Sequence, residues 1–94
     1  MKLPHKIRIT SRVSYEICFV DRFEDGSTLG ECRFHSRQIA LLKGQSETDM
    51  VKSLIHEVLH AVGHEGKFDL PHKAIYALEH ALHKVLTLNK WMPK

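Results

Sequence analysis

The chain has 94 residues, enough for one small domain and too few for a catalytic domain with a separate specificity domain. Its content of 43% hydrophobic and 27% charged residues, with 5 glycines and 3 prolines, excludes a disordered, collagen-like or linker protein. The net charge of +3 comes from 14 basic and 11 acidic residues spread along the chain, which is too weak and diffuse to predict nucleic-acid binding.

The N-terminal region and the two cysteines indicate the cellular compartment of the protein. No apolar run reaches the ~18 residues of a membrane span, and no signal-peptide core follows Met1. Cys18 and Cys32 are too few for a disulfide scaffold, so we expect reduced thiols. These features predict a cytoplasmic protein with no membrane partner.

Residues 6–43 have the hydrophobic pattern of β-strands. Apolar and polar residues alternate from Val13 to Phe19, which predicts a half-buried strand, and residues 24–27 carry a turn signal. The predicted strands cover residues 7–9, 13–20, 31–34 and 38–42. We expect them to form a small, mostly antiparallel sheet of three or four strands.

After Gly44 the apolar period becomes that of a helix. Ser46 is the predicted N-cap, with acidic residues in the first turn near the positive end of the helix dipole. Gly63 or Gly66 is the predicted end. One apolar stripe is formed by Val51, Leu54, Ile55, Val58 and Val62.

A second helix is predicted to begin at Asp69 or Leu70, just before Pro71, and to run towards Asn89. Its apolar face is formed by Ile75, Leu78, Leu82, Val85 and Leu86. The chain therefore predicts a single α+β domain over residues 1–94, with a sheet part (6–43) followed by a helical part (46–89).

The first helix contains the pattern H-E-x-x-H at residues 56–60. Histidines four residues apart lie one turn above each other, about 6 Å along the axis, so His56 and His60 can bind one ion. Glu57 projects from the adjacent edge of the helix, where it can reach a water on the metal without being a ligand. Zinc suits two imidazoles plus a third donor, with one position left open for water.

Residues 53–63 resemble the active-site helix of zinc metallopeptidases. A small sheet before that helix and one helix after it resemble the minimal gluzincin-type, zincin-like domains, and among these the ImmA/IrrE-like and short phage-encoded metallopeptidases. The resemblance covers residues 13–89, although only residues 56–60 are specific. It implies one zinc ion per chain and a protein or peptide substrate lying along a sheet edge, which we place at Gln38–Leu42.

The third zinc ligand has several candidates. The metzincin pattern requires a histidine six residues after His60, where this chain has Gly66. The same missing histidine counts against the YbeY-type ribonucleases. On a continuous helix, His64 would lie ~12 Å along the axis from His56, so it could bind the same ion only if the helix breaks at Gly63.

Glu79 is the favoured third ligand. It lies within the apolar stripe of the second helix, between Ile75 and Leu82, where a carboxylate needs a partner or a metal. The resemblance to gluzincins, whose third ligand is a glutamate on the next helix, implies the same role.

Further candidate cleft residues share the helix face of Glu79, namely His72, Tyr76 and His83. Tyr76 or His83 could donate a hydrogen bond to a developing oxyanion, and His83 is a further candidate for the third ligand.

These features predict a zinc metalloendopeptidase in which Glu57 is the general base. No motif for a serine or cysteine nucleophile is present. Two alternatives stay open: a non-catalytic binding protein stiffened by zinc, and a metal-dependent hydrolase of a non-peptide substrate. The oligomeric state is not indicated by the sequence.

Overall fold

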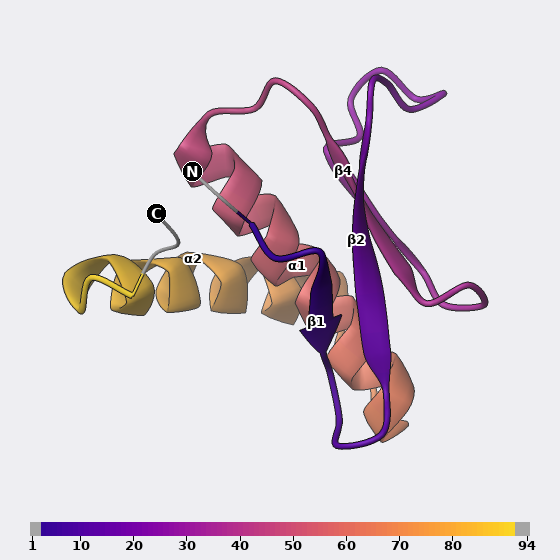
Figure 1. Ribbon diagram of the computed structural model, residues 1–94. Coiled ribbons are helices and arrows are strands. Elements are labelled where there is room, and N and C mark those ends of the chain that lie inside the picture. Colours follow the sequence, from indigo (N-terminus) through magenta and orange to yellow (C-terminus); the bar gives the residue numbers. More distant parts are fainter. Residues whose placement is uncertain (1–2, 92–94) are drawn as a thin grey trace.

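The computed structural model describes residues 3–91, so the two ends of the expected 1–94 domain lie outside the described residues. The elements follow in the order β1 (Lys6–Arg8), β2 (Ser14–Val20), β3 (Gly30–Arg33), β4 (Gln38–Leu42), α1 (Glu47–Gly66) and α2 (His72–Leu88). The sheet forms one layer, α1 packs on one face of it, and α2 crosses α1 on the side away from the sheet (Figure 1). The predicted α+β class is confirmed.

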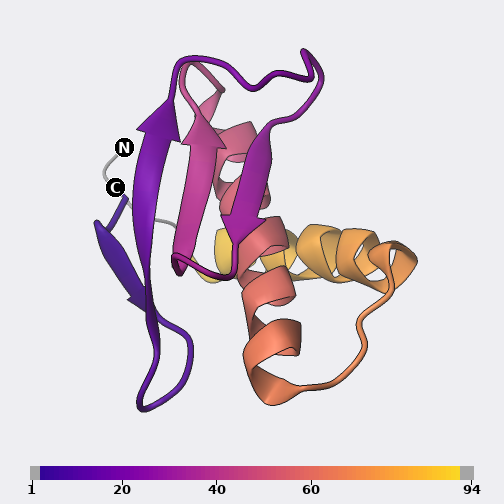
Figure 2. The ribbon, with the colours of Figure 1, turned by 90° about the vertical axis from the view of Figure 1, so that its right-hand side faces the viewer.

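The sheet is mixed rather than antiparallel, with strand order β1-β2-β4-β3 (Figure 2). The pairs β1–β2 and β3–β4 are antiparallel, but β2 and β4 are parallel, with Ile17 opposite Ile39. The prediction of a mostly antiparallel sheet was wrong at this pair. The long connection of residues 21–29 carries the chain past one strand position, and β4 then turns back from β3 into that position beside β2.

The strand order also corrects the predicted substrate edge. Gln38–Leu42 is an interior strand that pairs with β2 on one side and β3 on the other, and its central residues Ile39, Ala40 and Leu41 are fully buried. The prediction that this strand forms an edge was therefore wrong. β3 is the edge strand nearest to α1.

The hydrophobic core lies between the sheet and α1. Alternate residues of β2 and β4 point to the same face, as the period of two requires, and there they meet the apolar stripe of α1. Burial of each large side chain contributes ~1.5–3 kcal/mol, so this layer holds α1 against the sheet. The core is formed by Tyr15, Ile17, Ile39, Leu41, Leu54 and Ala61.

The ends of α1 agree with the sequence signals. The side chain of Ser46 accepts a hydrogen bond of 3.1 Å from the backbone N–H of Asp49, which confirms the predicted N-cap. The helix continues through Gly63 and ends at Gly66, where Lys67 adopts a left-handed conformation with φ of 56°. Of the two predicted ends, the second is correct.

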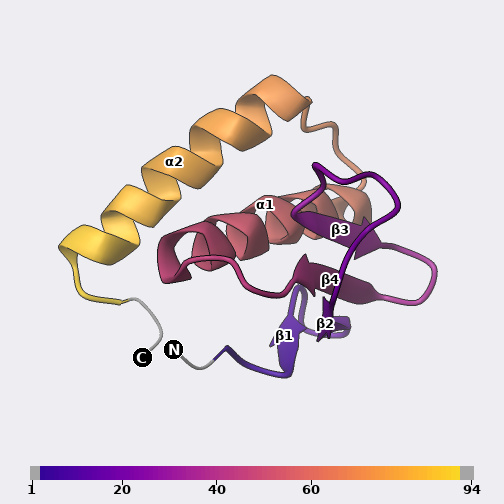
Figure 3. The same ribbon diagram turned by 90° about the horizontal axis from the view of Figure 1, so that it is seen from above.

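α2 begins after Pro71 and ends before Asn89, close to its predicted bounds. Its predicted apolar face is only partly buried: Ile75 is fully buried, whereas Leu82 is 40% and Val85 is 45% exposed. Within residues 3–91, α2 packs on α1 and on no strand, so most of its stripe extends beyond its contact with α1 (Figure 3). Neither helix in this part of the chain is long and apolar enough to span a membrane.

Candidate metal centre

The structure brings His56 and His60 together on α1, as the four-residue spacing predicts. Their Nε2 atoms are 3.2 Å apart, and the two rings meet edge to face with centroids 4.9 Å apart. Because both residues lie on one continuous helix, this geometry is local and does not depend on the rest of the fold.

His72 joins this pair from the first turn of α2. Its Nε2 atom is 3.2 Å from Nε2 of His60, and one nitrogen from each of the three histidines lies within 4.8 Å of the others. We call His56, His60 and His72 the histidine cluster. From the sequence, His72 was expected only to line the cleft. The only sequence signal for a closer role was the shared helix face with Glu79, because the contact itself depends on how α2 crosses α1.

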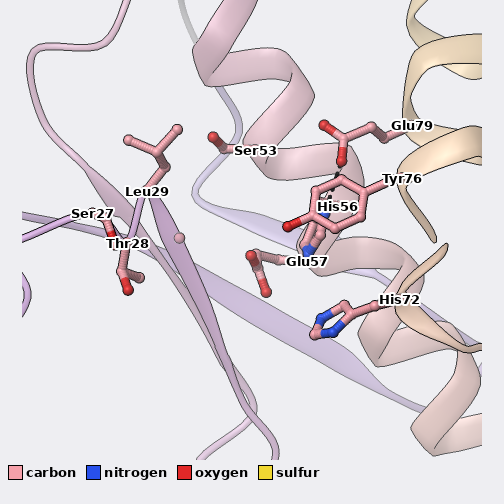
Figure 4. Close-up of a pocket in the computed structure, with 10 residues that line it drawn as sticks. Ser27, Thr28, Leu29, Ser53, His56, Glu57, His72, Tyr76 and Glu79 are labelled. Atoms are coloured by element: carbon pink, nitrogen blue, oxygen red, sulfur yellow. Dashed lines mark hydrogen bonds and ion pairs between the residues drawn. The ribbon is translucent and has the colours of Figure 1, made fainter. Parts of the chain in front are cut away.

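Glu79 approaches the cluster from behind His56. Its Oε1 atom is 2.8 Å from Nδ1 of His56, the ring nitrogen that is not directed at His60 (Figure 4). The side chain is well shielded, since Glu79 is 8% exposed. The carboxylate within the apolar stripe therefore has the partner that the sequence required, and that partner is an imidazole.

Glu57 is buried beside the cluster, at 6% exposure. Its pKa is raised to about 7, mainly because the carboxyl group is removed from water; the charge of His56 lowers the pKa, and the charges of Glu31 and Glu79 raise it. A Cβ atom at Gly30 would lie 3.1 Å from Oε2 of Glu57, so the glycine leaves room for this carboxylate. A buried carboxylate with a pKa near neutrality can both accept and return a proton.

The environment of His60 favours the neutral imidazole. Its pKa is lowered, mainly by burial and then by the neighbouring His56 and His72. A neutral imidazole offers a lone pair, which is the form that binds a metal.

A pocket of about 410 Å³ opens next to the cluster (Figure 4). One wall is formed by residues 27–30, the end of the long connection and the start of β3, and the other wall by α1 and α2. The sequence indicates only a turn near Ser27, and this wall of the pocket was not predicted. The helical wall consists of Ser53, His56, Glu57, His72, Tyr76 and Glu79.

Tyr76 covers the outer side of the cluster. Its ring centroid is 5.1 Å from that of His56 and 5.9 Å from that of His72, and its hydroxyl points into the pocket (Figure 4). Tyr76 therefore lines this pocket together with His56 and His72.

Two of the predicted site residues, His64 and His83, lie outside the histidine cluster. α1 does not break at Gly63, and His64 stacks on Phe34 with ring centroids 4.2 Å apart, outside the histidine cluster. His83 does not line the pocket beside the cluster, and among the described residues its buried Nε2 atom has no hydrogen-bond partner. His64 and Phe34 instead border a second, smaller hollow of about 220 Å³, which His60 also lines.

Comparison of the chain with models of known protein families, with curated proteins and with solved structures finds no match.

Proposed function

We propose that this protein is a zinc-dependent metallopeptidase with a zincin-like fold. The observation that carries the proposal is the buried Glu57 beside the convergent imidazoles of His56 and His60. Glu57 and His56 line a pocket that borders an edge strand. The free thiols of Cys18 and Cys32 support a cytoplasmic location as part of the same proposal.

The spacing of the histidines fits zinc. Two nitrogens that each lie ~2.0–2.1 Å from a tetrahedral zinc ion are about 3.3–3.4 Å apart. Nε2 of His56 and Nε2 of His60 are 3.2 Å apart. These two residues would hold the ion from α1, and α2 would supply a third donor. When bound, zinc lowers the pKa of a coordinated water towards ~7 and polarises a carbonyl group.

Glu57 acts as the general base in this proposal. Its carboxylate takes a proton from the attacking water and returns it to the nitrogen of the leaving amine. Burial suits this cycle because it brings the pKa of the carboxyl group close to neutrality. Tyr76 directs its hydroxyl into the same pocket, where it donates a hydrogen bond to the oxyanion that develops on the substrate.

The edge strand supports a peptide as the substrate. β3 pairs with β4 on one side only, so the backbone groups of its other side are available to an extended peptide. Gly30 lies on this strand and also lines the pocket, next to Glu57. A peptide paired with β3 would therefore pass the general base. We accordingly move the proposed substrate edge from Gln38–Leu42 to β3.

Glu57→Gln tests the proposal, because it keeps the shape of the side chain and removes the base. We expect unchanged zinc content and a 10²–10⁴-fold slower cleavage of any peptide that the wild type cleaves, found by screening a broad peptide library. Glu24→Gln, at an exposed position in the connection before β3, is the matched control and should cleave normally.

Equal rates for wild type and Glu57→Gln would exclude Glu57 as the base. A wild type that binds zinc and cleaves no library member would favour the non-catalytic, zinc-stiffened binding protein. Cleavage of small esters or amides without cleavage of peptides would favour a hydrolase of a non-peptide substrate.

A further inference from the structure

We infer that His72, at the start of α2, is the third metal ligand, and that Glu79 is a positioning residue that orients His56. The inference rests on the proposed zinc site and changes the ligand set from two histidines and a glutamate to three histidines. The evidence for this inference is the set of contacts made by the two ring nitrogens of His56 and by Nε2 of His60.

The contact with Glu79 determines where His56 carries its proton. A carboxylate only accepts hydrogen bonds, so at 2.8 Å the Nδ1 atom of His56 must be the donor. The side chains are 15% and 11% exposed, which shields this bond from water. In the neutral ring, Nε2 then has a lone pair directed at the cluster. A histidine ligand held in this way by a carboxylate is the common arrangement in protein zinc sites.

Glu79 lies on the wrong side of His56 to share its metal. The two nitrogens of an imidazole point in different directions, and the carboxylate occupies the Nδ1 side while Nε2 faces His60. His72 contributes its Nε2 atom on the side of the cluster. Among residues 3–91, the group of side chains that converge closely enough to hold one ion is His56, His60 and His72.

Hydrogen bonding alone does not satisfy the cluster. Nε2 of His60 lies 3.2 Å from Nε2 of His56 and 3.2 Å from Nε2 of His72. A ring nitrogen has either one proton or one lone pair, so this atom can form one good hydrogen bond and not two. This holds whether His56 is neutral or protonated. A cation among the three nitrogens removes the conflict, because all three lone pairs then have the same partner.

A cation would also balance the buried acidic groups. Glu57 and Glu79 are both buried beside the cluster, and a buried carboxylate is stable only when it is paired or close to a positive charge. Three neutral imidazoles leave the full double charge of zinc to offset these two carboxylates. The three-histidine set therefore agrees with the charge of the site as well as with its geometry.

Metal titration of the full chain tests the assignment without any substrate. We expect His72→Ala to weaken zinc and cobalt binding by ~10³-fold or more, as removal of a ligand does. Glu79→Gln should weaken it only ~10–100-fold, the usual effect of losing an orienting partner. His80→Ala, an exposed histidine on the same helix, is the matched control and should bind as the wild type does.

His72→Cys separates a ligand from a structural residue. A thiolate binds zinc and cobalt, so this variant should recover metal affinity and show the near-ultraviolet absorption of a cobalt–thiolate bond. In wild type, nitrogen NMR should place the proton of His56 on Nδ1, and Glu79→Gln should alter that signal.

Three results would overturn the inference. Loss of binding in Glu79→Gln with binding kept in His72→Ala would make Glu79 the ligand and leave the proposed function in place. A His72→Cys variant that binds cobalt without thiolate absorption would exclude position 72. A wild type that binds neither metal would overturn the proposed function together with the inference.

Discussion

The two helices differ in what holds them in place. α1 packs along the sheet and buries apolar residues such as Val51, Leu54 and Ala61. α2 packs on α1 alone, and its buried residues are Ile75 and Glu79. Since burial of apolar surface is the main source of stability, α1 is held by the hydrophobic core, whereas α2 depends on one isoleucine and on the polar contacts of the histidine cluster.

This difference suggests that the proposed metal site also has a structural role. An ion bound by His60 and His72 would join α1 to the first turn of α2. Metal binding and docking of α2 would then be linked, because an ion that binds only the docked form stabilises that form.

Zinc binding is expected to have the largest effect on the stability of the protein. Zinc at about 1,000 times its Kd should raise the free energy of unfolding by ~4 kcal/mol, measured by chemical denaturation. It should also slow amide hydrogen exchange more in α2 than in α1, because α1 is already held by the core. His60→Ala should lose both effects and His64→Ala should keep them. Equal stabilisation of His60→Ala would contradict the linkage.

Truncation of the buried isoleucine of α2 should have the next largest effect on stability. Ile75→Ala should lower the free energy of unfolding of the metal-free protein by ~2–5 kcal/mol, because it leaves a cavity between the helices. Leu82→Ala removes a similar side chain that is 40% exposed and should cost less than ~1 kcal/mol. Denaturation followed by circular dichroism compares the two variants; similar costs would mean that α2 is held along its whole length.

A hydrogen bond between the sheet and α1 should have a smaller effect. The hydroxyl of buried Tyr15 donates to Oε2 of Glu65 at 2.7 Å, and removing it in Tyr15→Phe should cost ~1–3 kcal/mol. Tyr76→Phe alters an exposed tyrosine on α2 and should change stability little. Chemical denaturation at neutral pH measures both variants.

Because of the hydrogen bond between Tyr15 and Glu65, we expect the protein to lose stability at alkaline pH. Burial and the neighbouring Glu65 raise the pKa of Tyr15 above its value in the unfolded chain. Its contribution is therefore fully present below the unfolded value of about 10, and is lost at up to ~1.4 kcal/mol per pH unit as the pH rises above it. Tyr15→Phe should show a shallower alkaline decline, and an unchanged decline would assign it to other groups.

The smallest effects on stability are expected at the N-termini of the two helices, which differ in capping. Ser46→Ala removes the hydrogen bond to Asp49 and should cost ~1 kcal/mol, whereas Ser46→Asp should retain the cap. α2 begins at Pro71 without a side-chain cap, so Pro71→Ala should stay within ~0.5 kcal/mol of wild type. A larger cost for Pro71→Ala would show that the entry to α2 is more constrained than its contacts indicate.

Features that depend on local spacing could be predicted from the sequence. The N-cap at Ser46 and the bounds of β4 follow from residues close to each other in the chain, and the end of α1 was narrowed to Gly63 or Gly66. The convergence of His56 and His60 is equally local, because four residues make one turn of a helix. The apolar position of Glu79 also showed that this carboxylate needs a partner.

The features that were not predicted depend on contacts between distant segments. The parallel pairing of β2 and β4, and the place of β3 at the edge, depend on how residues 21–29 cross the sheet. Helical periodicity places His72, Tyr76 and Glu79 on one face of α2, but not their distances from α1. Only the crossing of the helices decides that Glu79 contacts Nδ1 of His56 while His72 faces His60, because a rotation or shift of α2 by one residue would break those contacts.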